Sequence, residues 1–168
     1  MRPGYVLMLR RFLVVFALAV WFGGFTFYAA VVIPSGHEVL GSHREVGFIT
    51  QQVTRWLNLI GIAALSILLW NVRTVWCVAH ARLRAWLAAS LAVMSGAQIA
   101  LFLIHPSLDA LLDAESGGIL SRSHFYGLHR VYLIIATVQW LATLVHIYSG
   151  LASWRIADGQ GSRHENVA

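Results

Sequence analysis

Residues 124–150 read HFYGLHRVYLIIATVQWLATLVHIYSG, one long apolar run that nevertheless contains several polar side chains. On an α-helix of 3.6 residues per turn, Tyr132, Gln139, Thr143 and His146 fall within about 40° of one another and form a polar stripe. A polar group left unpaired in hydrocarbon costs several kcal/mol, so such a stripe normally faces protein or a cavity. The stretch therefore predicts a helix whose polar side packs against other helices.

The rest of the chain has the composition of an integral membrane protein. Of its 168 residues, 58% are hydrophobic and 11% are charged, whereas an average soluble domain has about 25% charged residues. Apolar runs of about twenty residues match the thickness of a bilayer. We predict an all-α fold in which residues 1–168 form a single integral membrane bundle of four transmembrane helices, with spans at about residues 12–33, 56–72, 85–104 and 131–151.

Glycine and proline mark the expected features within and at the ends of these spans. Gly23-Gly24 in the first span predicts either close approach of a neighbouring helix or a local bend. Pro34 is expected to end the first span, and His105-Pro106 the third. Apolar residues at helical spacing predict a short surface helix at about 107–116, and the chain after the fourth span reads as a polar, disordered-looking tail.

The arginines predict the orientation in the membrane. Eight lie in the segments that four spans place on the side of the termini, and four lie on the other side. The positive-inside rule therefore predicts a multi-pass protein of the bacterial inner membrane with both termini in the cytoplasm. In a membrane protein, the formal net charge of +5 is explained by these basic loops and not by nucleic-acid binding.

With this orientation, the outer face carries a cluster of histidine and aspartate residues. His105 and His129 lie at the outer ends of the third and fourth spans. Two imidazoles on facing helices can bind a haem iron axially, or share a copper or zinc ion with a carboxylate. They can also be interfacial histidines bonded to backbone or water, or a proton relay. The remaining outer residues are His37, His43, Asp109, Asp113 and His124.

No cofactor is the leading expectation, with haem or copper as the alternatives, because no spaced metal motif such as HExxH is present. Asp109 and Asp113 lie four residues apart on the predicted surface helix and are interpreted as solvated, not as a catalytic pair. The single Cys77 excludes an internal disulfide. Nucleophile motifs, a P-loop and GxGxxG are absent from the sequence, so a non-enzymatic protein is favoured.

Two interpretations apply to the polar residues inside the spans. Gln98 and Gln139 can pair across the third and fourth spans, an ordinary interhelical bond worth about 1 kcal/mol. Alternatively, Gln98, Gln139, Thr143 and His146 line a polar channel or small cavity. His146 is an ionisable group inside a span and therefore a functional hypothesis by default, although it can also serve as structural glue.

Three segments resemble an uncharacterised bacterial family of four-span membrane proteins, to which eukaryotic transmembrane protein 205 is distantly similar. They are WFGGFTFYAAVVIP at 21–34, HPSLDALLD at 105–113 and FYGLHRVYLIIATVQW at 125–140. The resemblance implies a four-helix membrane fold and brings no established activity. The chain is also broadly similar to four-span copper-import and haem-binding proteins, but it lacks a Met-rich or two-His-per-helix pattern. The residues that match the family pattern are Gly23, Gly24, Pro34, His105, Pro106, Asp109, His129 and Tyr132.

We therefore expect a membrane protein that is either a subunit of a larger complex or a small permease-like component with an outward-facing His/Asp cluster. Its expected partners are the lipid bilayer and other membrane subunits or a second copy of itself. Two alternatives belong to other classes: a redox protein that binds haem or quinone between the third and fourth spans, and a copper-handling protein.

Overall fold

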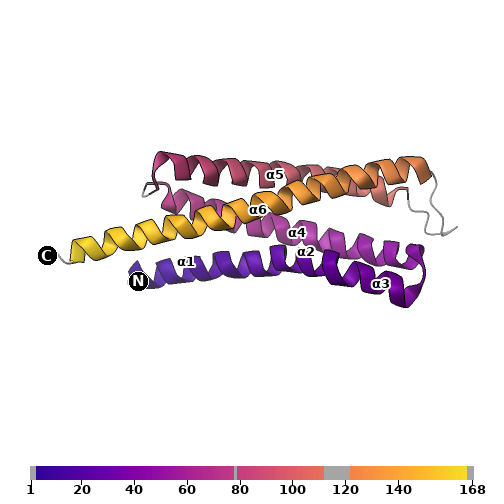
Figure 1. Ribbon diagram of the computed structural model, residues 1–168, viewed down its shortest axis with the longest axis horizontal. Helices are drawn as coiled ribbons and strands as arrows, with labels where there is room; N and C mark the ends of the chain where they lie inside the picture. The colour runs from indigo at the N-terminus through magenta and orange to yellow at the C-terminus, as the bar shows by residue number, and fades with distance from the viewer. Residues whose placement is uncertain (1–2, 78, 112–121, 166–168) are drawn as a thin grey trace.

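The computed structural model describes residues 3–77, 79–111 and 122–165, and all the regular elements among them are helices, as predicted. Four long helices lie side by side, each antiparallel to the one before it in the chain, in an elongated bundle (Figure 1). The first is an unbroken series of five segments: α1 (Pro3–Leu18), the π-helix η1 (Ala19–Gly23), α2 (Gly24–Phe27), the π-helix η2 (Tyr28–Val32) and α3 (Ile33–Leu40). The other three are α4 (His43–Val75), α5 (Ala81–Asp109) and α6 (Arg122–Glu165).

All four helices are long and apolar enough to cross a membrane. The stretches that meet this condition are Gly4–Leu40, Glu45–Val75, Ala81–Asp109 and Ser123–Gly159. Each extends beyond the predicted span at both ends, because the apolar run ends before the hydrogen-bonded helix does. Both chain ends and the connection from α4 to α5 lie at one end of the bundle, which we call the terminal end; the opposite end is the distal end (Figure 1).

The prediction that Pro34 ends the first helix was wrong. Proline lacks an N–H group and its ring clashes with the carbonyl four residues earlier in a regular α-helix. Here the π-helix η2 directly precedes it, and the wider turn accommodates the ring, so α3 continues to Leu40. The helix ends instead at Gly41, whose φ of 59° is left-handed, and Ser42 then caps α4 by accepting a hydrogen bond from the backbone N–H of Glu45.

His105-Pro106 does not end the third helix either, because α5 continues to Asp109. Residues 107–109 of the predicted surface helix therefore belong to α5, and residues 112–116 lie outside the part of the chain that the structure describes. The prediction of a disordered-looking tail was also wrong for the residues up to Glu165, because α6 continues to that residue. Beyond the predicted span, α1 and α4 contact this helix at Asp158 and Trp154, which local sequence patterns do not reveal.

The helices α5 and α6 pair along a seam of buried residues spaced alternately four and three apart. On α6 the seam consists of Tyr132, Ala136, Gln139, Thr143, His146, Gly150 and Ser153, and on α5 of Leu83, Leu87, Ser90, Met94, Ala97 and Leu101. This spacing is the one that lets two helices pack nearly in line, with the side chains of each filling gaps in the other. The predicted polar stripe on 124–150 is therefore part of this seam.

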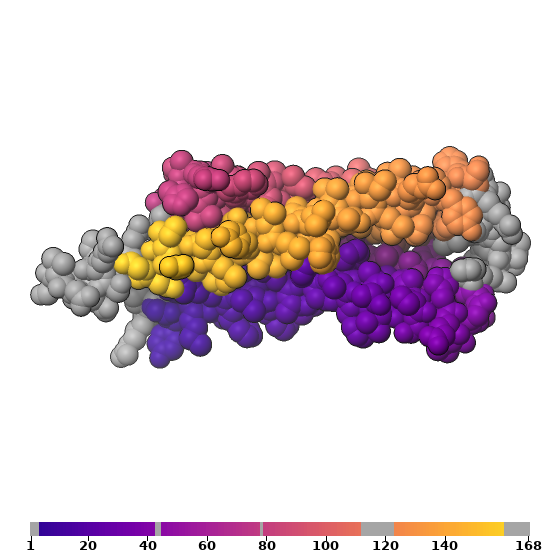
Figure 2. Space-filling view, in the orientation of Figure 1, coloured from indigo at the N-terminus to yellow at the C-terminus, as the bar shows by residue number. Residues whose placement is uncertain are grey.

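The buried apolar residues form two clusters, one toward each end of the bundle. The larger one includes Val14, Leu68 and Leu87, and the smaller one includes Leu101 and Tyr132. Figure 2 shows α6 running obliquely across one face, close to α1 in the terminal half. In the distal half, a hollow separates α6 from the α2–α3 part of the first helix.

Close helix approach occurs at Gly61 of α4 and not at the Gly23-Gly24 pair. A Cβ at Gly23 would meet nothing within 4 Å, and one at Gly24 would meet only Leu57 at 3.8 Å. The glycine pair instead coincides with the end of a π-helix, which corresponds to the local-bend interpretation. A Cβ at Gly61 would lie 2.5 Å from Oε1 of Gln98 and 2.7 Å from Nε1 of Trp21.

Replacing Gly61 by alanine should therefore destabilise the protein, by about 1–3 kcal/mol as for other overpacked cores. The two nearest side chains are buried, and Gln98 is held by hydrogen bonds, so neither moves away freely. Reversible unfolding in mixed micelles measures the change in free energy. The matched control is Gly96→Ala, because a Cβ there meets nothing within 4 Å and alanine favours a helix by up to about 1 kcal/mol. Equal effects of the two substitutions would contradict the tight packing at Gly61.

Candidate functional site

A layer of three buried amide side chains lies between the two apolar clusters and joins three helices. Gln98 of α5 donates from Nε2 to the Oδ1 of Asn58 on α4 at 3.1 Å and lies 3.2 Å from its backbone oxygen. Gln139 of α6 donates to Oε1 of Gln98 at 3.0 Å and lies 3.2 Å from the backbone oxygen of Met94. The pairing of Gln98 with Gln139 was predicted from sequence; Asn58 was not recognised as the third member of this amide layer.

A cavity of about 30 Å³ adjoins the amide layer. A space of this size holds one or two water molecules, and a buried water needs several polar partners. The cavity provides them, since its polar lining consists of Thr54, Asn58, Gln98, Tyr132, Gln139 and Thr143. Gln98, Gln139 and Thr143 of the predicted channel or cavity therefore meet here, whereas His146 lies elsewhere.

His105 connects this cavity to the distal end of the bundle. Its Nδ1 lies 2.9 Å from Oδ2 of Asp109, one turn further along α5. Its Nε2 lies 2.9 Å from Oγ1 of Thr54, and Thr54 lines the cavity. The Thr54 hydroxyl also lies 2.7 Å from the backbone oxygen of Thr50 and donates to it, so Thr54 accepts from Nε2–H of His105, and a second proton can lie between Nδ1 and the Asp109 carboxylate. Carboxylate, imidazole and hydroxyl thus form a continuous chain, which we call the distal relay.

His129 does not join His105. Its ring stacks on Phe125, one turn earlier in α6, with ring centroids 5.8 Å apart and planes 5° from parallel. Both ring nitrogens of His105 already contact Asp109 and Thr54. The two histidines thus have different neighbours in the structure, and the shared metal site or axial haem pair considered for them stays a prediction. Among residues 3–77, 79–111 and 122–165, no group of three or more His, Cys, Asp or Glu residues is placed to hold a metal ion.

The other outer-face residues are spread over several elements. His37 lies in the last turn of α3, and His124 is exposed at the start of α6. Asp113 and the side chain of His43 lie outside what the structure describes. Of the predicted outer cluster, His105 and Asp109 are in direct contact.

His146 lies in the terminal half of the α5–α6 seam and is 2% exposed. Its Nδ1 is 2.9 Å from Oγ of Ser90 on α5, and that hydroxyl also lies 2.7 Å from the backbone oxygen of Trp86. The single hydroxyl proton is directed at the Trp86 carbonyl, so Ser90 accepts from Nδ1–H of the histidine. Nε2 then carries a lone pair, and within the part of the chain that the structure describes it has no hydrogen-bond partner. His146 is thus only half satisfied.

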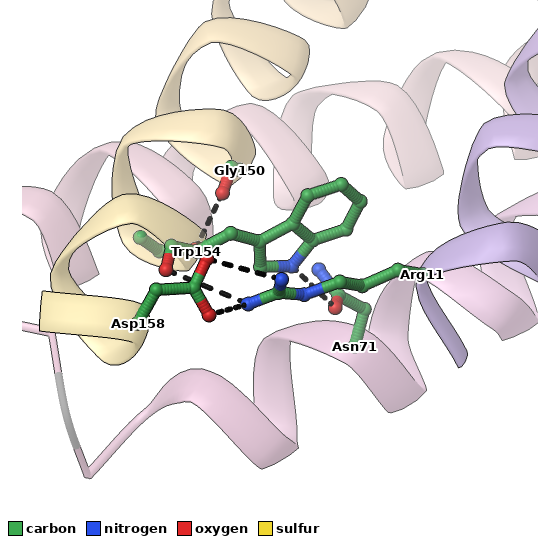
Figure 3. Close-up of polar contacts among 6 residues, drawn as sticks. Arg11, Asn71, Gly150, Trp154 and Asp158 are labelled. Atoms are coloured by element: carbon green, nitrogen blue, oxygen red, sulfur yellow. Dashed lines mark hydrogen bonds and ion pairs between the residues drawn. The ribbon is translucent and has the colours of Figure 1, made fainter. Parts of the chain in front are cut away.

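A third polar group fastens the terminal end of α6 (Figure 3). Both terminal nitrogens of Arg11 contact the carboxylate of Asp158, at 2.7 and 3.1 Å, and its guanidinium lies 5.3 Å from the ring centroid of Trp154. The indole Nε1 of Trp154 donates to Oδ1 of Asn71 on α4 at 3.1 Å. Sequence reasoning missed this terminal clamp. The sequence signal that was available is the presence of Asn58 and Asn71 in an otherwise apolar predicted span, because a buried amide needs a hydrogen-bond partner.

Comparison with known proteins found no matching family model, no matching curated protein and no matching solved structure. The resemblance to a bacterial four-span family and to transmembrane protein 205 stays a prediction.

Removing one amide of the layer should weaken the bundle without preventing it from folding. We expect Gln139→Leu to lower the free energy of unfolding by about 0.6–2 kcal/mol, because interhelical polar bonds in membrane proteins have this range. Leucine also removes the hydrogen-bond donor to Gln98. Unfolding of Gln98→Leu, Gln139→Leu and the double variant in mixed micelles gives the coupling between the two residues. Strictly additive effects would contradict a direct bond.

Proposed function

We propose that the chain is a four-span protein of the bacterial inner membrane. The supporting observation is the distribution of polarity. Buried positions include Asn58, Asn71, Gln98, Gln139 and His146, whereas large apolar side chains cover much of the exterior. Lipid favours this arrangement, because polar groups find partners only inside the bundle and apolar ones need no shielding. Phe16, Ile99, Leu103, Ile134 and Leu141 are among the outward-facing apolar residues, each more than half exposed.

The proposed orientation places the terminal end in the cytoplasm. Arg10 and Arg11 of α1, Arg73 near the end of α4, and Arg82 and Arg84 at the start of α5 lie toward that end. This is the more basic side, which the positive-inside rule assigns to the cytoplasm.

Cys77 offers a direct test of this orientation, because it is exposed just after α4, at the terminal end. A membrane-impermeant maleimide should leave it unlabelled in intact spheroplasts and label it after permeabilisation. The control is the double variant Cys77→Ser, His124→Cys, which moves the thiol to an exposed position at the distal end. That variant should be labelled in intact spheroplasts. The opposite pattern in both proteins would reverse the orientation.

We further propose that the protein is a small, permease-like component that conducts protons, alone or as a subunit of a larger membrane complex. The distal relay carries this proposal. An ionisable group within a membrane span is costly and commonly marks a proton pathway. Here Asp109, with a side chain 32% exposed, is followed by His105 at 12% and by Thr54 at the cavity. Accessibility therefore decreases stepwise from the distal end toward the amide layer.

The geometry allows the imidazole to pass a proton between its two partners. In the inward direction, Asp109 passes a proton to Nδ1 and the ring releases its Nε2 proton to the oxygen of Thr54, whose own hydroxyl proton passes to a cavity water, which becomes hydronium. The reverse sequence moves a proton outward. In either direction the ring gains one proton and loses one, and reorientation of the ring then restores the proton on Nε2. Below the cavity, Thr143 and His146 continue the polar side of α6 toward the terminal end.

Proton flux into proteoliposomes tests the proposal. Vesicles that contain the protein and an internal pH-sensitive dye should acidify or alkalise, under a potassium-valinomycin potential, faster than protein-free vesicles. His105→Ala should reduce this flux at least tenfold, because it removes the only imidazole between Asp109 and Thr54. Thr54→Val, which keeps the side-chain shape, should also reduce it.

His124→Ala is the matched control, since His124 is an exposed histidine at the same end of the bundle and lies outside the relay. It should leave the flux unchanged. All variants are compared after gel filtration confirms equal folding. A wild-type flux equal to that of protein-free vesicles, or an unchanged flux in His105→Ala, would overturn proton conduction through the distal relay.

A further inference from the structure

A second, larger pocket lies between the first helix and α6 in the terminal half of the bundle. Its volume is about 310 Å³, which is at the lower end of the range for small-molecule sites. Two glycines, Gly23 and Gly150, face it from opposite sides, and a Cβ at either would meet nothing within 4 Å. We call it the lateral pocket. Phe22 lines both this pocket and the central cavity.

The lateral pocket is apolar except for two side chains, Asn71 and His146. Val15 and Leu151 line it as well and are more than half exposed, so it opens on the apolar exterior of the bundle. A ligand therefore reaches it from the lipid, and the ligand itself must be lipid-soluble. The deeper wall contains the buried ring of His146, whose Nε2 is closed off from the pocket space in this structure, so a ligand hydroxyl reaches that atom once the adjoining side chains shift.

His146 determines what polar group such a ligand needs. The bond to Ser90 places the proton of the neutral ring on Nδ1, so Nε2 is a hydrogen-bond acceptor, and no residue that the structure describes bonds to it. A buried acceptor that is left unpaired loses the hydrogen bonds it would make to water and destabilises the fold. A ligand hydroxyl satisfies it, whereas a carbonyl oxygen, which is itself an acceptor, does not.

The aromatic lining favours a flat ring. Phe22 and Trp154 both line the pocket. The terminal clamp fixes the indole of Trp154 at Nε1 through Asn71 and on its face through Arg11, as Figure 3 shows. Phe22 is fixed by stacking on Trp140, with ring centroids 5.4 Å apart. Aromatic rings prefer offset-stacked or edge-to-face neighbours, and walls that are already ordered lose little entropy on binding.

We propose that the lateral pocket binds a lipid-soluble aromatic molecule bearing a ring hydroxyl, a phenol or hydroquinone, which donates a hydrogen bond to Nε2 of His146. The site lies between α1 and α6, apart from the interface of the third and fourth spans considered from sequence. It shares no residue with the distal relay of Asp109, His105 and Thr54, and probe binding is measured without any proton flux, so failure of one proposal is distinguishable from failure of the other.

Calorimetric titration of the purified full chain in detergent tests the proposal with two probes that differ only in the donor, 2,3,5-trimethylphenol and its methyl ether. Titrations into detergent alone are subtracted. The phenol should bind about fivefold more tightly than the ether, since one buried hydrogen bond contributes about 1 kcal/mol. His146→Phe should reduce phenol binding to the level of the ether. Equal affinities of phenol and ether for the wild type would overturn the assigned hydrogen bond.

A pair of glycine variants keeps the test decisive if His146→Phe does not fold. Gly150→Leu should fill the lateral pocket and remove binding of both probes. Gly96→Leu adds the same side chain to an exposed site on α5, with nothing within 4 Å of its Cβ, and should bind both probes as the wild type does. Unchanged phenol binding in Gly150→Leu would place the probe elsewhere and overturn the site.

A second pair of probes tests the hydrogen-bond donor in a larger class of ligand. If trimethylhydroquinone binds and the corresponding benzoquinone does not, the requirement for a donor extends to hydroquinones; tighter binding of the benzoquinone would contradict this requirement.

Discussion

The pairing of α5 with α6 is the constraint on which the other features depend. Buried residues recur alternately at four and three residues along both helices, and they include amide, hydroxyl and imidazole groups. Because lipid supplies no hydrogen bonds, each of these groups must find its partner across the seam or in its own helix. Gln139 meets Gln98, and His146 meets Ser90, so the register of the two helices is set by polar complementarity as well as by shape.

The first helix joins this pair less closely and in two places. At the terminal end, Arg11 binds Asp158 and covers the ring of Trp154. Nearer the middle, Trp140 stacks on Phe22 and donates through Nε1 to Oγ1 of Thr26 at 2.9 Å. The lateral pocket lies between these two points, and Gly23 of the first helix and Gly150 of α6 are among its lining residues. Neither glycine has a side chain to fill the space, since a Cβ at either position would meet nothing within 4 Å.

The two spaces in the bundle differ in chemistry because they lie on different sides of Phe22. The central cavity adjoins the amide layer and the distal relay, so its lining both donates and accepts hydrogen bonds and suits water or a proton. The lateral pocket has apolar walls and a single unpaired acceptor, and it opens toward the exterior. One small bundle can therefore offer a polar route in its distal half and an amphiphile site in its terminal half.

Composition and periodicity determined the all-helical class, the four long apolar helices and the polar stripe on α6, because these follow from chain-local hydrophobicity and the 3.6-residue repeat. The bond between Gln98 and Gln139 was also predictable, since two amides in adjacent apolar helices have few other partners. The helix ends were not predictable. A π-helical turn precedes Pro34 and accommodates its ring, and α6 continues past the predicted span, where Trp154 and Asp158 contact α4 and α1.

Tertiary structure alone decided which histidines have which partners. His105 and His129 lie in corresponding places in the sequence pattern, yet one contacts Asp109 and Thr54 while the other stacks on Phe125. The rotation of each helix about its axis decides between these outcomes. Successive side chains on an α-helix point about 100° apart around its axis, so a small rotation of the helix changes which neighbour a side chain meets. The packing of all four helices together sets that rotation.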